Sequence, residues 1–153
     1  MVQFYSNLGD VYNKLKNYTE SDKYFEKALT IDPNEATVLN NYAYYLSVRN
    51  EQLDKAETMS KKSNELVANS ASYQDTYAWI LFRESKFADA KIWLEKAMQS
   101  GGDKNGTILE HYGDVLFKLG DVEKAVSYWN QAKATGDHSE IIDKKITDKK
   151  LYE

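Results

Sequence analysis

Apolar and polar residues alternate along the chain with the three- and four-residue spacing of amphipathic helices. In the first 15 residues the large apolar side chains follow a 3-4-3 spacing and fall on one helical stripe: Tyr5, Leu8, Tyr12 and Leu15. A polar turn at Asn17 separates this stripe from a second apolar segment, which ends at Asp32-Pro33. The pattern therefore predicts two helices joined by a short turn within the first 35 residues.

Small residues recur along the whole chain with one period. In the first predicted helix of each unit they are spaced by 34, 35 and 35 residues: Gly9, Ala43, Ala78 and Gly113. Two further series in the second predicted helices are each spaced by 35, 34 and 35 residues: Ser21, Ala56, Ala90 and Ala125, then Ala28, Ser63, Ala97 and Ala132. Because three independent series keep the same period, the chain is predicted to hold four copies of one two-helix unit.

The clearest copy of this unit reads Leu109-x-x-Tyr112-Gly113-x-x-Leu116, followed by Ala125-x-x-x-Trp129 and Ala132. The pattern resembles the tetratricopeptide repeat, a helix–turn–helix unit of about 34 residues, over about residues 2–137. The resemblance is weaker in the second and third copies, where Ser60 and Leu94 occupy the usual aromatic position. It implies an all-α fold, namely a right-handed α-solenoid of four helix–turn–helix units.

The expected units cover about residues 2–35, 36–70, 71–105 and 106–137 of one domain that spans 1–153. Asp137-x-x-Glu140 has the form of a capping box, and Ile142 and Ile146 lie one helical turn apart. These residues predict a C-terminal capping helix over about 138–150, which would shield the apolar face of the last repeat. No comparable cap precedes Met1. We therefore interpret the chain as a piece of a longer protein and predict self-association through its uncovered N-terminal edge.

Composition excludes several classes of function. The 153 residues carry 20 Lys and Arg against 24 Asp and Glu, a net charge of −4, which offers no basic surface for nucleic acid. The longest apolar run, Ala78–Phe82, is too short for membrane insertion. Cysteine is absent, so no thiolate can hold a cofactor or act as a nucleophile. The segments Leu39–Leu46 and Asp75–Phe82 look like bacterial members of the family, some of which work in the cell envelope, and the compartment stays open.

Catalytic motifs are absent from the sequence, so we do not expect an enzyme or a cofactor. The one local cluster of reactive groups is Glu110, His111 and Asp114. His111 and Asp114 are three residues apart on one helix face and could approach a metal ion together. We favour the alternative that the cluster lines a polar groove and that the protein binds no metal.

In the family that the pattern resembles, the first helix of each unit lines a concave groove that binds peptides or partner segments. The groove positions of this chain are expected to be Asn7, Asp10, Asn40, Asn41, Tyr44, Asp75, Thr76, Trp79, Phe82, Glu110, His111 and Asp114. Asparagine amides can bind a peptide backbone, and the aromatic residues would anchor an apolar side chain. The basic residues of chaperone-binding members are missing, since Ser6, Asp10, Ser72 and Thr76 stand in their places.

The leading functional prediction is a non-catalytic scaffold that binds a protein or peptide segment in this groove. Because acidic residues flank the expected aromatic patch, the ligand is predicted to be neutral to basic, with an apolar anchor. Two alternatives stay open: an architectural spacer or assembly domain of a larger protein, and a glycan-binding platform formed by Tyr44, Trp79 and Phe82. Exposure of the aromatic patch discriminates between binding and architecture.

Overall fold

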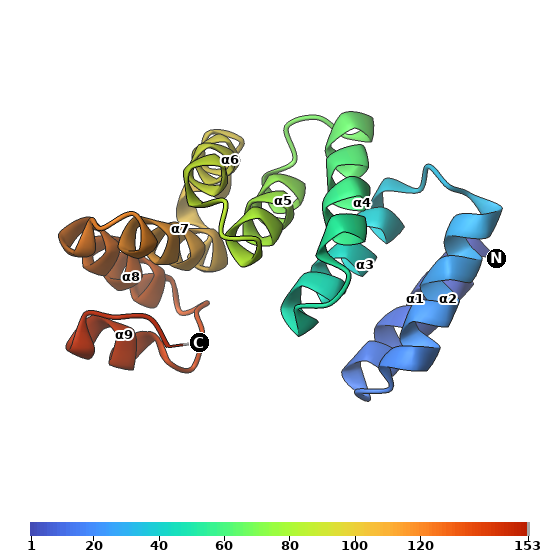
Figure 1. Ribbon diagram of the computed structural model, residues 1–153, viewed down its shortest axis with the longest axis horizontal. Helices are drawn as coiled ribbons and strands as arrows, with labels where there is room; N and C mark the ends of the chain where they lie inside the picture. Colours follow the sequence, from blue (N-terminus) through green and yellow to red (C-terminus); the bar gives the residue numbers. More distant parts are fainter. Residues whose placement is uncertain (153) are drawn as a thin grey trace. The chain divides into compact units, whose positions relative to one another are not determined.

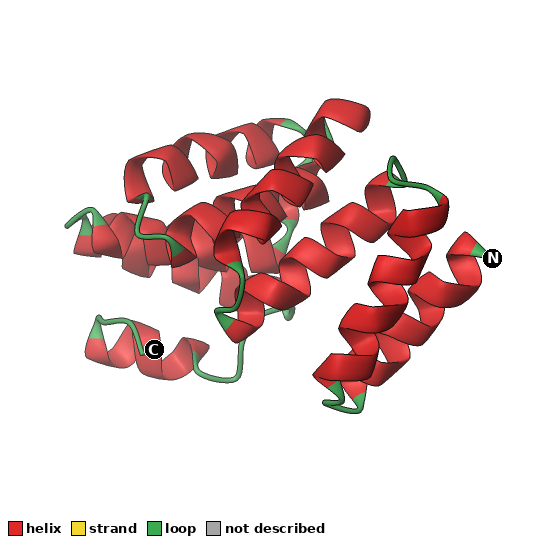
Figure 2. Ribbon diagram, turned by 45° about the vertical axis from the view of Figure 1, so that its right-hand side comes forward, coloured by secondary structure: helices red, strands yellow, loops and turns green. Residues whose placement is uncertain are grey.

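The computed structural model describes residues 1–152, and every regular element within that range is a helix (Figure 2). The elements, in chain order, are α1 (Val2–Lys14), α2 (Tyr18–Ile31), α3 (Ala36–Arg49), α4 (Leu53–Leu66), α5 (Ala71–Arg83), α6 (Phe87–Gln99), the 3-10 turn η1 (Gly102–Lys104), α7 (Gly106–Lys118), α8 (Val122–Thr135) and α9 (Ile142–Asp148). The predicted all-α fold is confirmed, with each unit built as a helix pair.

The helix pairs group into two compact units, which are described separately below. The first unit, residues 1–68, contains the pairs α1–α2 and α3–α4. The second unit begins at Asn69 and contains the pairs α5–α6 and α7–α8, with α9 packed against α8 (Figure 1). In both units the second helix of one pair also packs against the first helix of the next, which is the stacking expected of a helical repeat.

The small residues of the three periodic series are buried between the helices. A Cβ atom added to Gly9 would lie 2.8 Å from the Phe25 ring, and one added to Gly113 would lie 2.5 Å from the Trp129 indole. In the two middle pairs alanine replaces the glycine, and a residue smaller than Phe25 or Trp129 takes the aromatic position. Ala43 occurs with Ser60 and Ala78 with Leu94, and all four are buried. A larger residue at the small position therefore occurs with a smaller residue at the aromatic position.

The turn inside each pair depends on one residue in the left-handed backbone region. This residue lies at the same place in all four helix pairs: Lys16 (φ 58°), Asn50 (φ 56°), Ser85 (φ 62°) and Gly120 (φ 92°). Only the fourth pair, α7–α8, has glycine here, the residue that adopts this conformation without steric cost. Asn17 and Asp121 then cap α2 and α8, since their side chains accept hydrogen bonds from the backbone N–H groups of Glu20 and Lys124.

A tyrosine–glutamate hydrogen bond joins consecutive pairs in both units. Tyr42 of α3 donates to Glu26 of α2 at 3.1 Å, and Tyr112 of α7 donates to Glu95 of α6 at 2.8 Å. Burial, followed by the nearby carboxylates, raises the pKa of both phenols above the usual range. Each tyrosine thus remains a neutral donor, and the repeated contact fixes the register of one pair on the next.

The capping helix is shorter than predicted. It begins at Ile142, and neither Asp137 nor Glu140 caps it, so the predicted capping box is wrong. The reason lies in Ser139, whose backbone N–H and hydroxyl both donate to Glu110 of α7 and hold the preceding segment out of a helix. Ile142 is buried in the core, with 1% of its surface exposed, and Ile146 packs beside it.

The outer face of α1 carries an uncovered apolar stripe. Met1, Phe4, Val11 and Leu15 expose 73%, 56%, 49% and 69% of their surfaces. The residues of α7 at the places of Phe4 and Val11 are Ile108 and Val115, which are buried where α7 packs on α6. The face of α1 therefore has the chemistry of a helix-packing surface. No helix within residues 1–152 is both long and apolar enough to cross a membrane.

Candidate functional site

The predicted groove residues of the first unit lie on α1 and α3. Asn7 is exposed and accepts a hydrogen bond from Gln3, whereas Asn40 is buried and donates to Asn41 at 3.3 Å. The remaining two predicted residues are Asp10, which accepts a hydrogen bond from Tyr45 at 3.0 Å, and the exposed Tyr44. Burial, together with Asp10, raises the pKa of Tyr45 to about 12. Asp10 thus links α1 to α3.

Five of the seven predicted residues of the second unit, all except Asp75 and Thr76, line a hollow of about 300 Å³. Its lining comes from α5, α7 and the C-terminal segment: Trp79, Phe82, Arg83, Glu110, His111, Asp114, Ser139, Ile141, Lys145, Leu151 and Tyr152. Thr76 is not part of this lining, because its hydroxyl is buried and donates to the Ser72 carbonyl of its own helix. Five of the twelve predicted groove residues therefore meet at this hollow, and we take it as the candidate binding site.

A ladder of three rings forms one wall of the hollow. The Trp79 indole stacks on the His111 imidazole with ring centres 4.2 Å apart, and on the Phe82 ring with centres 4.8 Å apart. Phe82 is buried, with 7% of its surface exposed, while Trp79 is half-buried. Trp79 thus presents a rigid, partly open aromatic surface, the kind of group that anchors a partner side chain.

Asp75 of α5 holds His111 of α7 in place. The His111 Nδ1 and an Asp75 carboxylate oxygen lie 2.8 Å apart. Burial lowers the pKa of His111, but the Asp75 carboxylate and its hydrogen bond, with smaller contributions from Asp114 and Glu110, outweigh burial and raise the pKa above its usual value. The contact with Asp75 therefore ties α7 to α5 and fixes the imidazole on which the Trp79 indole stacks.

A buried ionic network closes the opposite wall. Lys145 of α9 donates to Glu110 at 2.6 Å and to Asp114 at 2.9 Å, and only 4% of the Lys145 surface is exposed. Ser139 donates to Glu110 and the Trp129 indole donates to Asp114 at 2.9 Å. Burial alone would raise the pKa of Glu110, but hydrogen bonds from Lys145 and Ser139 lower it; burial dominates at Asp114 and raises its pKa.

This network changes the interpretation of the acidic residues. The acidic flanks were expected to favour a neutral to basic ligand. In the structure, Asp75, Glu110 and Asp114 all bind side chains of the second unit itself, as Asp10 binds Tyr45 in the first. Lys145 also lies between Glu110 and Asp114, where a metal ion would have to lie. Within residues 1–152 no group of three or more His, Asp or Glu side chains is arranged to hold a metal.

Two important residues of the site escaped the sequence analysis. Lys145 lies three residues after Ile142 on the buried side of α9, and that position is the signal that would have identified it. Arg83 ends α5, and the turn that follows gave no reason to count it with the groove. Its Nε–H is buried and meets no acceptor within residues 1–152.

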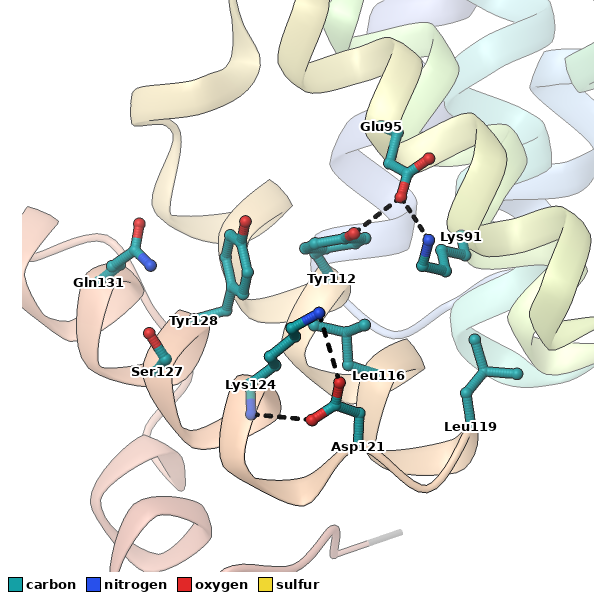
Figure 3. Close-up of a pocket in the computed structure, with 10 residues that line it drawn as sticks. All are labelled: Lys91, Glu95, Tyr112, Leu116, Leu119, Asp121, Lys124, Ser127, Tyr128 and Gln131. Atoms are coloured by element: carbon teal, nitrogen blue, oxygen red, sulfur yellow. Dashed lines mark hydrogen bonds and ion pairs between the residues drawn. The ribbon is translucent and has the colours of Figure 1, made fainter.

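A second, more open hollow of about 590 Å³ lies between α6 and α8 over the face of α7 (Figure 3). Tyr112, Glu95 and Lys91 line it and satisfy one another, since Tyr112 and Lys91 both donate to Glu95. Lys124 lies 3.7 Å from Asp121 at the lower edge. The charged groups of this hollow already have partners, so we do not take it as the candidate site.

The stacked helix pairs define an α-solenoid repeat protein, and the comparisons with known proteins agree. Tetratricopeptide repeat models match residues 2–35 and 24–58. The TPR repeat-containing protein PA4667 of Pseudomonas aeruginosa is 26% identical over 101 residues, which cover 66% of this chain and 17% of that protein. The match thus spans a small part of that relative. The family models thus identify tetratricopeptide repeats within residues 2–58.

Solved structures show the same fold. TTC0263, a thermophilic TPR protein of Thermus thermophilus, has a TM-score of 0.85 at 18% identity, and the match covers 97% of this chain and 81% of that one. YrrB, described as a TPR protein with an unusual peptide-binding site, has a TM-score of 0.67 at 17% identity, with coverage of 86% and 66%. At these identities the likeness concerns the fold alone.

Proposed function

We propose that this chain is a non-catalytic interaction module whose second unit binds a protein segment by receiving an apolar side chain in the hollow beside Trp79. One observation carries the proposal: a half-buried indole, stacked between two rings, borders a hollow of about 300 Å³ that the side chains of the second unit leave open. That volume is at the lower end of ligand pockets, about 300–1,000 Å³. It suits one side chain of a peptide better than a large ligand.

The remaining features of the site fit a binding role. The reactive groups are engaged in structural contacts, with His111 bound to Asp75 and both Glu110 and Asp114 bound to Lys145. Among the described residues that line the hollow, no free base or nucleophile is left to act on a substrate. The peptide-binding site attributed to YrrB supports the proposal by analogy of fold.

The proposal is tested by selecting peptides from a random displayed library on the whole protein and measuring their affinities. Trp79→Ala should weaken the selected peptides by about 30-fold, the loss typical of an aromatic hot spot of about 2 kcal/mol. Trp79→Leu keeps apolar volume in the ladder and should lose less. Trp93→Ala, which removes an indole packed on Tyr77 away from the hollow, is the matched control.

Two results would contradict the proposed binding site. One is a selection that enriches no peptide above background, which would favour a purely architectural role. The other is a set of peptides whose affinity is equally affected by Trp79→Ala and Trp93→Ala. Circular dichroism of each variant shows whether its helices are intact.

We also propose that the chain self-associates through the apolar stripe of α1. Phe4 and Val11 are about half exposed, and their counterparts on α7 are buried by a packed helix. Phe4→Lys with Val11→Lys should shift the protein to monomer in sedimentation velocity, because two charges would be buried unpaired in the contact. Val48→Lys, on α3 with 53% of its surface exposed, is the control. A wild-type protein that sediments only as monomer at high concentration contradicts this proposal.

A further inference from the structure

Arg83 is the one charged residue of the candidate site that has no partner within residues 1–152. Besides His111, which is bound to Asp75, the charged residues of the lining are Arg83, Lys145, Glu110 and Asp114. Lys145 binds both carboxylates, so its charge and theirs are engaged with each other. The Arg83 guanidinium ends α5 beside Phe82, and its buried Nε–H meets no acceptor anywhere in the described chain.

A buried donor without an acceptor destabilises the folded protein, because it loses its hydrogen bond to water and gains none in return. Proteins rarely keep such a group unless something else supplies the acceptor. The donors of a guanidinium form a planar fork, which matches the two oxygens of a carboxylate better than any other group of a protein. Because Arg83 lines the hollow, its guanidinium is placed to meet an acceptor carried by whatever occupies the hollow.

A cationic ligand does not fit the site. An incoming lysine or arginine would need a free carboxylate, yet Glu110 already accepts from Ser139 and Lys145. Asp114 accepts from Lys145 and Trp129, and Asp75 is bound to His111. A cationic ligand would have to displace Lys145, a buried group fixed by α9.

We propose that the segment bound in this hollow carries an aspartate or glutamate side chain next to its apolar anchor, and that Arg83 binds that carboxylate. The inference rests on the proposed function, because the anchor beside Trp79 brings the acidic group to Arg83. It replaces the neutral-to-basic ligand expected from the sequence with an acidic one. Arg83 is thus the residue that selects the partner, and Trp79 supplies the apolar contact.

The test uses individual synthetic peptides on an array, each acetylated and amidated so that no terminal carboxylate is present. Every peptide contains one phenylalanine in a serine–glycine background, with glutamate, glutamine or lysine at each neighbouring position in turn. On the wild-type protein the glutamate series should bind about tenfold tighter than the glutamine series at one spacing or more, because a hydrogen bond to a charged group is stronger than one to a neutral amide. Salt should reduce this preference.

Variants of Arg83 identify the residue responsible. Arg83→Gln should bring glutamate peptides down to the level of glutamine peptides, and Arg83→Glu should reverse the preference toward lysine. Lys124→Gln removes the same charge from the other hollow and should preserve the preference for glutamate. Since the Arg83 Nε–H has no internal acceptor, these changes leave no partner unpaired in residues 1–152.

The outcomes separate the two proposals. If phenylalanine peptides bind through Trp79 but glutamate and glutamine bind alike, the inference about Arg83 is wrong and the proposed function stands. If the glutamate preference survives Arg83→Gln, another residue selects the acid and the inference is equally wrong. If no peptide binds, or binding ignores Trp79→Ala, the proposed function fails and the inference fails with it.

Discussion

Replacing Lys145 with methionine is expected to lower the free energy of unfolding of the second unit by about 3–5 kcal/mol. Methionine keeps the length of the side chain but removes the ammonium between Glu110 and Asp114, both of which are buried. Two carboxylates would then face each other with too few donors. Urea unfolding followed by tryptophan fluorescence measures the effect, since Trp79, Trp93 and Trp129 all belong to the second unit.

Lys144→Met is the matched control, because Lys144 is the exposed neighbour on α9 and its loss should change stability little. Adding Glu110→Gln and Asp114→Asn to Lys145→Met should recover part of the loss, since no uncompensated charge then remains. In Lys145→Met the two carboxylates lose their cation, so their pKa values rise in the folded state. Stability of this variant should therefore increase relative to wild type as the pH falls and the carboxylates take up protons. Equal stabilities of Lys144→Met and Lys145→Met would show that the network contributes nothing.

The sequence predicted the helix pairs well because the information for them is local and repeated. A stripe of apolar residues, a small residue at a fixed place and a polar turn recur every 34 or 35 residues, so each copy corroborates the others. The middle units also follow this rule, although they depart from the usual aromatic position: Ala78 faces a leucine position, where Gly113 faces a tryptophan. A larger residue at the small position thus occurs with a smaller residue at the aromatic position.

The contacts of the acidic residues could not be predicted in the same way. Three of them bind a residue on a later helix: Asp10 of α1 binds Tyr45 of α3, Asp75 of α5 binds His111 of α7, and Asp114 of α7 binds Lys145 of α9. These partners are 35, 36 and 31 residues apart, and which carboxylate meets which donor depends on side-chain direction in the stack. These acidic residues were predicted to contact a ligand, and in the structure they bind neighbouring helices.

This distinction explains the start of α9. A capping box would start the helix at about residue 138, but the backbone N–H and the hydroxyl of Ser139 both donate hydrogen bonds to Glu110. The chain then turns and begins its helix at Ile142, which lets Lys145 reach both carboxylates of α7. The contact with the buried Glu110 thus overrides the local capping signal, because leaving a buried charge unpaired costs more free energy than losing a helix cap. What remains open in the second unit is the surface formed by Trp79 and Arg83.

Replacing Trp129 with alanine is the second change with a large expected effect. Trp129 is fully buried between α7 and α8, and truncation of a buried aromatic side chain costs about 3–5 kcal/mol. It also removes the indole N–H that donates to Asp114 at 2.9 Å. Urea unfolding monitored by the remaining tryptophans should therefore show a transition at much lower urea. Trp93→Ala, at a partly buried position on α6, should cost clearly less.

The same interface allows a test of whether the residue at position 113 depends on the size of the residue at position 129. A Cβ atom on Gly113 would lie 2.5 Å from the Trp129 indole and 3.1 Å from the Ala125 carbonyl oxygen, so Gly113→Ala should destabilise wild type by about 1–3 kcal/mol. In a Trp129→Leu background the same substitution recreates the Ala78 and Leu94 combination of the preceding pair, both buried there. Gly113→Ala should then be neutral or stabilising, because alanine favours helix over glycine by about 1 kcal/mol. A double-mutant cycle in urea measures this coupling, and additive effects within about 0.5 kcal/mol would mean that the two positions are independent.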